Sequence, residues 1–215
     1  MPSLIYIADP MCTWCYGFAP ELVTLLQGLP DLPVEIIAGG LRAYNKQPLE
    51  DNLCATMQDH CDRVANACAM PFAATPVLQP GMVYDTEPAC RALVTARVMA
   101  PEASFAVLHA MQHAFFAEGR DVGDGNVLAD VCARAMAESG FPVAPEAFKD
   151  KWMSREMVLA TAEDFGQTRR WGVNGFPTLI LERNGRLDLV TAGYVGTEQL
   201  IEQMQAVIDG ETVPA

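Results

Sequence analysis

Two cysteines near the start of the chain, Cys12 and Cys15, are separated by two residues. The apolar run before them, residues 4–8, has the β-branched and aromatic content of a strand, and residues 19–26 after them carry apolar side chains at helical spacing. The pair is therefore expected at the first turn of a helix, where unpaired N–H groups and the helix dipole favour a thiolate. This chemistry predicts a redox dithiol in which Cys12 attacks and Cys15, one turn further on, resolves.

Metal binding is the alternative interpretation of such a motif. A structural zinc site usually needs a second pair of ligands. The other cysteines form no second C-x-x-C: Cys54, Cys61, Cys68, Cys90 and Cys132. The first three of these recur every seven residues, about 10 Å apart along a helix, which suits small core residues better than one metal or a disulfide. His109 and His113 have i, i+4 spacing but lack the glutamate of H-E-x-x-H. We therefore expect no metal.

Length, composition and charge exclude several classes of protein. The chain has 215 residues, of which 51% are hydrophobic and 19% are charged, enough to build a sizeable core. A net charge of −13 argues against nucleic acid or an anionic membrane as partner. No apolar run approaches the roughly 18 residues of a membrane span, and residues 1–3 carry no basic leader. We expect a cytoplasmic protein, in which a reducing environment keeps most of the seven cysteines as thiols.

The order of the predicted elements indicates a fold. Strands are predicted at residues 4–8, 33–38, 177–182 and 186–191, with Gly39-Gly40 ending the second and an Asn184-Gly185 hairpin joining the last two. Helices are predicted from the cysteine motif to about residue 28 and at 50–70, 86–100, 101–118, 124–139, 145–152, 154–171 and 197–208, with Thr86 and Ser154 as N-caps. This is the order of an α/β thioredoxin fold with a mixed sheet, β-α-β then α-β-β-α, and an all-helical insertion after the second strand. We expect a thioredoxin-like domain at residues 1–44 and 154–215, and a helical insertion domain at 45–153.

A redox dithiol also needs a surface that holds the substrate, and residues 173–178 are the candidate. A proline is tolerated at the first residue of a strand, and X-Pro bonds can be cis. In this fold Pro177 would lie beside Cys12, and the backbone of Phe176 would pair with an extended substrate by strand addition. We therefore expect a cis bond before Pro177.

The motifs resemble a known family. Residues 9–18, Asp-Pro-Met-Cys-Thr-Trp-Cys-Tyr-Gly-Phe, together with residues 175–178, Gly-Phe-Pro-Thr, resemble the DsbA-like branch of the thioredoxin superfamily, above all its cytoplasmic FrnE-like oxidoreductases. Residues 87–92 and 116–121 are also similar to that group. The resemblance implies a thiol–disulfide oxidoreductase with a cis-proline at Pro177 and a helical insertion that roofs the active site. The expected substrates are protein disulfides or glutathione mixed disulfides, with no cofactor other than glutathione as a co-substrate.

Two departures from DsbA bear on the chemistry. DsbA has Pro-His between its cysteines, whereas this chain has Thr13 and Trp14, which supply a hydroxyl and an apolar surface but no cation. We therefore expect a less oxidising dithiol, with Thr13, Trp14, Phe176 and Thr178 contacting the substrate. DsbA also has an acid on the strand before the motif, at the position that aligns with Tyr6, so Asp9 and Glu35 are the candidate substitutes for proton handling.

Two other functions stay open at this point. Kappa-type glutathione transferases and related isomerases share this layout, but they use a serine at the nucleophile position, where this chain has Cys12. A DsbA-like adaptor that delivers proteins to a Clp protease would make binding, not the dithiol, the main activity. The substrate, the electron partner and the oligomeric state are not fixed by the sequence.

Overall fold

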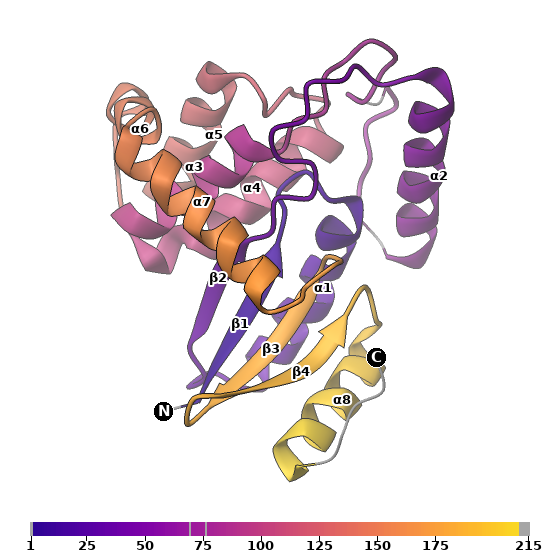
Figure 1. The fold of residues 1–215 in the computed structure, drawn as a ribbon, viewed down its shortest axis with the longest axis vertical. Coiled ribbons are helices and arrows are strands. Elements are labelled where there is room, and N and C mark those ends of the chain that lie inside the picture. Colours follow the sequence, from indigo (N-terminus) through magenta and orange to yellow (C-terminus); the bar gives the residue numbers. More distant parts are fainter. Residues whose placement is uncertain (1, 69, 76, 211–215) are drawn as a thin grey trace.

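A mixed four-stranded sheet forms the centre of the molecule, in the order β2-β1-β3-β4 (Figure 1). The computed structural model describes residues 2–68, 70–75 and 77–210. Strand β1 (Ser3–Ala8) is parallel to β2 (Val34–Ala38) and antiparallel to β3 (Thr178–Arg183), which in turn pairs with β4 (Arg186–Ala192) in an antiparallel hairpin. The four predicted strands and the hairpin at Asn184-Gly185 are confirmed, and both turn residues have positive φ.

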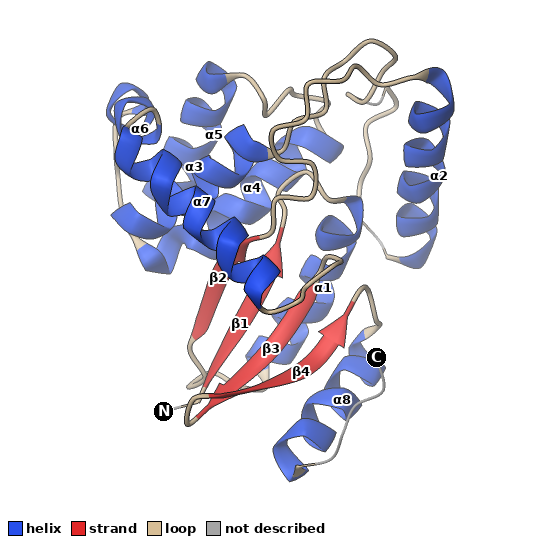
Figure 2. Ribbon diagram, in the orientation of Figure 1, coloured by secondary structure: helices blue, strands red, loops and turns tan. Residues whose placement is uncertain are grey.

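Helices surround the sheet in the predicted order. In the part of the chain that the structure describes they are α1 (Thr13–Gln27), α2 (Asp51–Ala67), α3 (Glu87–Met99), the short 3₁₀ turn η1 (Pro101–Ala103), α4 (Ser104–Phe116), α5 (Gly125–Glu138), α6 (Pro145–Trp152), α7 (Arg155–Arg170) and α8 (Thr197–Asp209). Figure 2 shows α1 behind the sheet, α7 in front of it, α3 to α6 gathered beyond one end of it, and α2 apart from them on the right. This is the thioredoxin fold with the expected helical insertion. One hydrophobic core runs through both parts, and the predicted domain boundaries stay a prediction.

The central strand β1 decides which side chains face the dithiol. Because side chains alternate along a strand, Leu4, Tyr6 and Ala8 point into the core shared with α1. Ile5 and Ile7 point to the opposite face and form a smaller cluster with other isoleucines. All residues of β1 from Leu4 onward are buried, as expected for a strand with neighbours on both edges. The alternation therefore puts the Tyr6 side chain beneath the start of α1.

The outer edge of β2 is held by a partly buried ion pair. The Asp164 carboxylate of α7 accepts the backbone N–H of Ala38 at 2.8 Å. Arg97 of α3 donates to both oxygens of that carboxylate, at 2.9 and 2.7 Å, and also to the backbone carbonyl of Ile36. An unpaired strand edge is thereby closed, and the insertion is fastened to the sheet.

One of the two predicted helix caps differs from the structure. Ser154 caps α7 as predicted by accepting the Met157 N–H, but Thr86 does not cap α3. The Thr86 backbone is already helical, and its hydroxyl instead accepts the N–H of Arg42. A tertiary contact has replaced the local one.

The predicted core role of Cys54, Cys61 and Cys68 holds fully at Cys61 and in part at Cys54, which packs against the core. Cys61 is buried, whereas Cys54 and Cys68 are partly exposed. Only Cys61 and Val64 of the residues of α2 are buried, because the helix contacts the rest of the protein along a narrow side. Cys68 lies just past the end of this helix in extended backbone. The seven-residue repeat therefore does not place it on the same helix face as Cys54 and Cys61.

The ion pair at the edge of β2 gives a stability prediction. Asp164→Asn should lower the free energy of unfolding by about 2 kcal/mol or more, because it leaves the partly buried Arg97 without its charged partner. Urea denaturation measures the change. The matched control is Glu163→Gln, one residue away, which breaks an exposed pair with Arg170 and should cost about 0.5 kcal/mol or less. Equal losses in the two variants would contradict this account.

Candidate active site

The cysteine pair lies where the sequence predicts it, at the start of α1. Strand β1 ends at Ala8, and a turn closed by the Cys12 N–H and the Asp9 carbonyl oxygen, 3.0 Å apart, leads into the helix. Cys12 is the N-cap residue with extended backbone, and Thr13 is the first helical residue. Cys12 therefore lies at the helix terminus, where backbone N–H groups favour a thiolate.

The two thiols are close and differ in access. Cys12 and Cys15 are free thiols that approach each other to 3.5 Å. Cys12 is 5% exposed and Cys15 is 0% exposed, so an incoming group reaches Cys12 first. Burial, and after it the adjacent Cys12 thiol, raises the pKa of Cys15 well above its usual value. This arrangement suits Cys12 as the attacking thiol and Cys15 as the resolving one.

The loop before β3 lies beside Cys12. The Phe176-Pro177 peptide bond is cis, as predicted, and the Cys12 thiol donates to the Phe176 carbonyl oxygen at 3.8 Å. The Phe176 ring lies over Gly39, where a Cβ atom would be 2.4 Å from the ring. Gly39 therefore does more than end strand β2: its missing side chain lets this loop approach the cysteines.

The predicted substrate contacts do not all reach the surface. The Thr178 side chain is 2% exposed and its hydroxyl donates to the Gly175 carbonyl, so it shapes the loop, and a direct contact with substrate is not supported. Thr13 is also buried, with its hydroxyl 3.8 Å from the Cys61 sulfur. Thr13 faces α2, and its contact with the substrate stays a prediction.

Trp14 is the partly exposed member of the motif. The Trp14 ring centroid is 5.6 Å from that of Tyr194. The guanidinium of Arg63, a residue of α2, lies 5.7 Å from the Trp14 ring centroid. The indole is therefore held between the insertion and the loop that precedes α8. An aromatic surface fixed in this way next to a reactive thiol suits contact with a substrate.

A buried carboxylate lies under the cysteine turn. Asp9 is 0% exposed and accepts the N–H groups of Met11 and Leu41 at 2.9 and 2.7 Å, and the thiol of Cys90 at 3.3 Å. Burial raises the pKa of Asp9, and these donors partly offset that rise. Of the two acids proposed from the sequence, only Asp9 belongs to the site. Glu35 is exposed on β2, three residues before the end of that strand.

The insertion supplies residues that sequence reasoning missed. The Tyr84 hydroxyl donates to the Met11 carbonyl, inside the cysteine turn, and burial raises the pKa of Tyr84 well above its usual value. Cys90 reaches Asp9 from α3. These residues follow the turn by more than seventy positions, and no local spacing links them to it.

The histidines do not form a metal site with other ligands in the part of the chain that the structure describes. The described ranges contain no group of three or more His, Cys, Asp or Glu residues able to hold a metal ion. The His113 ring nitrogen lies 3.3 Å from Glu118, and the His109 ring packs 6.5 Å from that of Tyr16. Within the same ranges, no helix is both long and apolar enough to span a bilayer.

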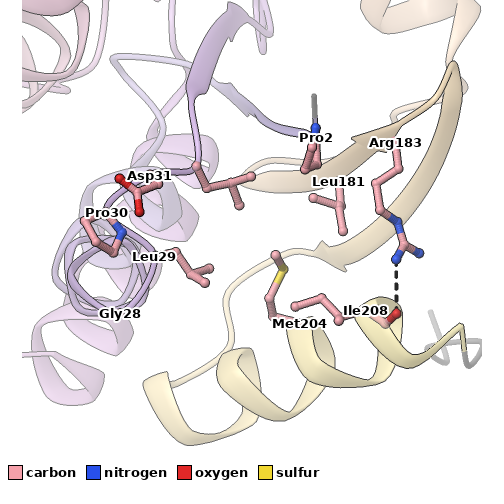
Figure 3. Close-up of a pocket in the computed structure, with 10 residues that line it drawn as sticks. Pro2, Gly28, Leu29, Pro30, Asp31, Leu181, Arg183, Met204 and Ile208 are labelled. Carbon is pink, nitrogen blue, oxygen red and sulfur yellow. Dashed lines mark hydrogen bonds between the residues drawn. The ribbon is translucent and has the colours of Figure 1, made fainter.

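A mostly apolar groove of about 460 Å³ lies away from the thiols (Figure 3). It lies between the loop after α1, strand β3 and helix α8, where Arg183 donates to the Ile208 carbonyl at 3.1 Å. Since α1 has 15 residues and starts at the cysteines, its other end is about 20 Å from them. The groove is therefore separate from the dithiol site.

Comparisons with known proteins agree with this geometry. A family model, the DSBA-like thioredoxin domain, matches residues 4–205. The structure of a candidate protein disulfide isomerase from Nitrosomonas europaea is 33% identical, covers 97% of this chain and 98% of its own, and has a TM-score of 0.86. The search of curated proteins found no match.

Two further solved proteins are similar. The cytosolic disulfide reductase DsbM from Pseudomonas aeruginosa is 27% identical over 96% of this chain and 98% of its own, with a TM-score of 0.75. The structure of DsbM with GSH is 25% identical, covers 96% of this chain and 99% of its own, and has a TM-score of 0.72. A 2-hydroxychromene-2-carboxylate isomerase is 16% identical, covers 96% of this chain and 94% of its own, and has a TM-score of 0.63. This similarity shows the fold alone.

The buried carboxylate gives a pH prediction. Because burial raises the folded-state pKa of Asp9 above its unfolded value of about 3.9, the folded protein binds more protons between the two values. Stability must therefore fall as pH rises through that window. Urea denaturation of the wild type and of Asp9→Asn between about pH 3 and pH 8 measures this effect. The unfolding free energy of the wild type minus that of Asp9→Asn should decrease from about pH 4 upward.

Asp124 provides the control with the opposite sign. Its carboxylate caps α5 by accepting the N–H groups of Val127 and Asn126, which lowers the pKa of Asp124. The stability contributed by that carboxylate is lost as pH falls, so wild type minus Asp124→Asn should increase with pH. A flat or rising difference for Asp9→Asn would show that burial does not raise the pKa of Asp9.

Proposed function

The chain belongs to the family of DSBA-like thioredoxin domains and is a thiol–disulfide oxidoreductase, and we propose that Cys12 and Cys15 exchange disulfides with proteins and with glutathione mixed disulfides. The observation that carries the proposal is the pair of free thiols at the start of α1, 3.5 Å apart, of which Cys12 is slightly exposed and Cys15 is fully buried. A dithiol with this asymmetry can bind a substrate covalently through the Cys12 sulfur, while the Cys15 sulfur stays available to resolve the mixed disulfide.

The exchange proceeds in two displacements. The Cys12 thiolate attacks one sulfur of the substrate disulfide, that bond breaks, and the first substrate thiolate leaves and takes a proton. The Cys15 thiolate then attacks the Cys12 sulfur, which breaks the mixed disulfide, releases the second substrate thiol and forms the Cys12–Cys15 disulfide. Two electrons pass from the dithiol to the substrate, and two molecules of glutathione return the dithiol to its reduced form as they become glutathione disulfide.

The substrate is proposed to lie between Trp14 and the cis-proline loop. The carbonyl of Phe176, which accepts from the Cys12 thiol here, is a backbone group that an extended substrate can pair with. Pro177 carries no N–H or charge that would compete for the thiolate. The partly exposed Trp14 ring provides the apolar contact on the other side.

The glutathione part of the proposal, and a role as a reductase in the cytoplasm, are supported by similarity to DsbM. That protein is described as a cytosolic disulfide reductase and has a structure with GSH. The proposed direction agrees with the absence of a cation between the cysteines, since fewer groups stabilise the thiolate and the dithiol gives up its electrons more readily. Glutathione acts here as a co-substrate.

The two rival functions have no specific support. The isomerase in the comparisons shares the fold but only 16% of the sequence, and a fold by itself does not fix a function. The adaptor function does not need a pair of thiols in contact.

Single cysteine variants test the proposal. Cys12→Ser should lower the rate of reduction of a glutathione mixed disulfide by about a hundredfold or more, because the attacking thiolate is removed. Cys15→Ser should accumulate a covalent adduct on Cys12, since the resolving thiol is missing, and intact-mass analysis detects that adduct. The control Cys132→Ala changes a cysteine that is buried in α5, away from the site, and should retain activity if it folds.

Other outcomes would favour the rivals. Activity that survives Cys12→Ser would sink the dithiol mechanism. A partner protein that still binds the double variant, Cys12→Ser with Cys15→Ser, while disulfide exchange cannot be detected in the wild type, would favour the adaptor.

A further inference from the structure

The Tyr6 hydroxyl is a buried polar group that the mechanism so far does not use. Tyr6 is 1% exposed, and its hydroxyl oxygen makes no hydrogen bond of good geometry with any residue that the structure describes. Buried hydroxyls nearly always have a partner, because leaving water without one costs free energy. A phenylalanine would fill the same space without that cost, so the hydroxyl calls for an explanation.

The surroundings of this hydroxyl indicate what it serves. Tyr6 projects from β1 toward the start of α1, and its ring packs against Phe18, with centroids 6.0 Å apart. The ionisable groups beside the hydroxyl are the Cys15 and Cys12 thiols. Burial, and then the two thiols, raises the pKa of Tyr6 well above its usual value, so this hydroxyl keeps its proton at neutral pH.

The buried sulfur of Cys15 needs such a donor. Cys15 is 0% exposed, so water cannot solvate its thiolate, yet the second displacement requires that thiolate. The backbone N–H of Asp9 faces the same sulfur and lowers the pKa of Cys15, but burial outweighs it. A second hydrogen-bond donor would therefore raise the fraction of the reactive form.

We propose that Tyr6 is a positioning residue whose hydroxyl donates a hydrogen bond to the Cys15 sulfur when that thiol ionises, and so promotes the resolving displacement. The inference rests on the proposed function, because it concerns the second step of that reaction. In that step the Cys15 sulfur bonds to the Cys12 sulfur, the bond from Cys12 to the substrate sulfur breaks, and the released substrate thiolate takes up the proton that Cys15 has lost. The Tyr6 proton stays on its oxygen.

The test separates the two displacements in Tyr6→Phe, which removes only the hydroxyl. A Cys12–glutathione adduct is formed, and its resolution is followed by rapid acid quench and intact-mass analysis from about pH 6 to pH 9. We expect resolution to be about tenfold slower at neutral pH, the loss typical of one hydrogen bond of about 1.4 kcal/mol. Its pH profile should shift to higher pH, while the first attack by Cys12 changes less than about twofold.

Tyr16→Phe is the matched control. The Tyr16 side chain is also buried, next to Cys15 in the sequence, but its hydroxyl donates to the Pro71 carbonyl at 3.0 Å and not to sulfur. It should leave the resolution rate and its pH profile unchanged, even if stability falls. Denaturation of both variants shows whether each is folded at the assay temperature.

The outcomes keep this inference apart from the proposed function. If the wild type resolves its adduct and Tyr6→Phe does so at the same rate with the same pH profile, the role of Tyr6 is overturned and the dithiol mechanism stands. If the wild type itself does not resolve the adduct, the proposed function fails, and the role of Tyr6 fails with it.

Discussion

The Asp9 carboxylate is buried among backbone and side-chain donors, and no described cation pairs with it. A charge in that position is tolerated only if hydrogen bonds replace the lost water. Three separate segments provide them: the cysteine turn through Met11, the loop after β2 through Leu41, and helix α3 through Cys90. Moving any one of these segments would leave the carboxylate short of a donor, so Asp9 ties the position of Cys12 to the packing of the insertion.

The insertion is therefore part of the active site and not only a roof over it. Tyr84 binds the cysteine turn, Cys90 binds Asp9, and Arg97 joins α3 to α7 and the edge of β2. A thioredoxin-like sheet and helix position the two sulfurs, while the inserted helices close the space around them. Cys15 has no contact with solvent, so its ionisation depends on the few donors within reach.

The residues that could be predicted from sequence are those whose roles follow from local patterns. The C-x-x-C at a strand-to-helix junction, the Gly-Phe-Pro-Thr segment and the element order each depend on neighbours in the chain, and the structure has them as expected, the cis bond before Pro177 included. The network around Asp9 depends on contacts between residues as far as 81 positions apart, and no periodicity encodes such contacts. The prediction for Glu35 rests on its chemistry alone, and its exposure on an edge strand removes it from the site.

The most direct test of the central claim is an equilibrium titration of the protein in glutathione buffers, read by thiol trapping and intact mass. The account predicts that one disulfide forms, that it maps to Cys12 and Cys15, and that its potential is more negative than the roughly −120 mV of DsbA. A pair that stays as thiols across all buffers, or a disulfide that maps to other cysteines, would contradict the claim that these two sulfurs are the redox centre.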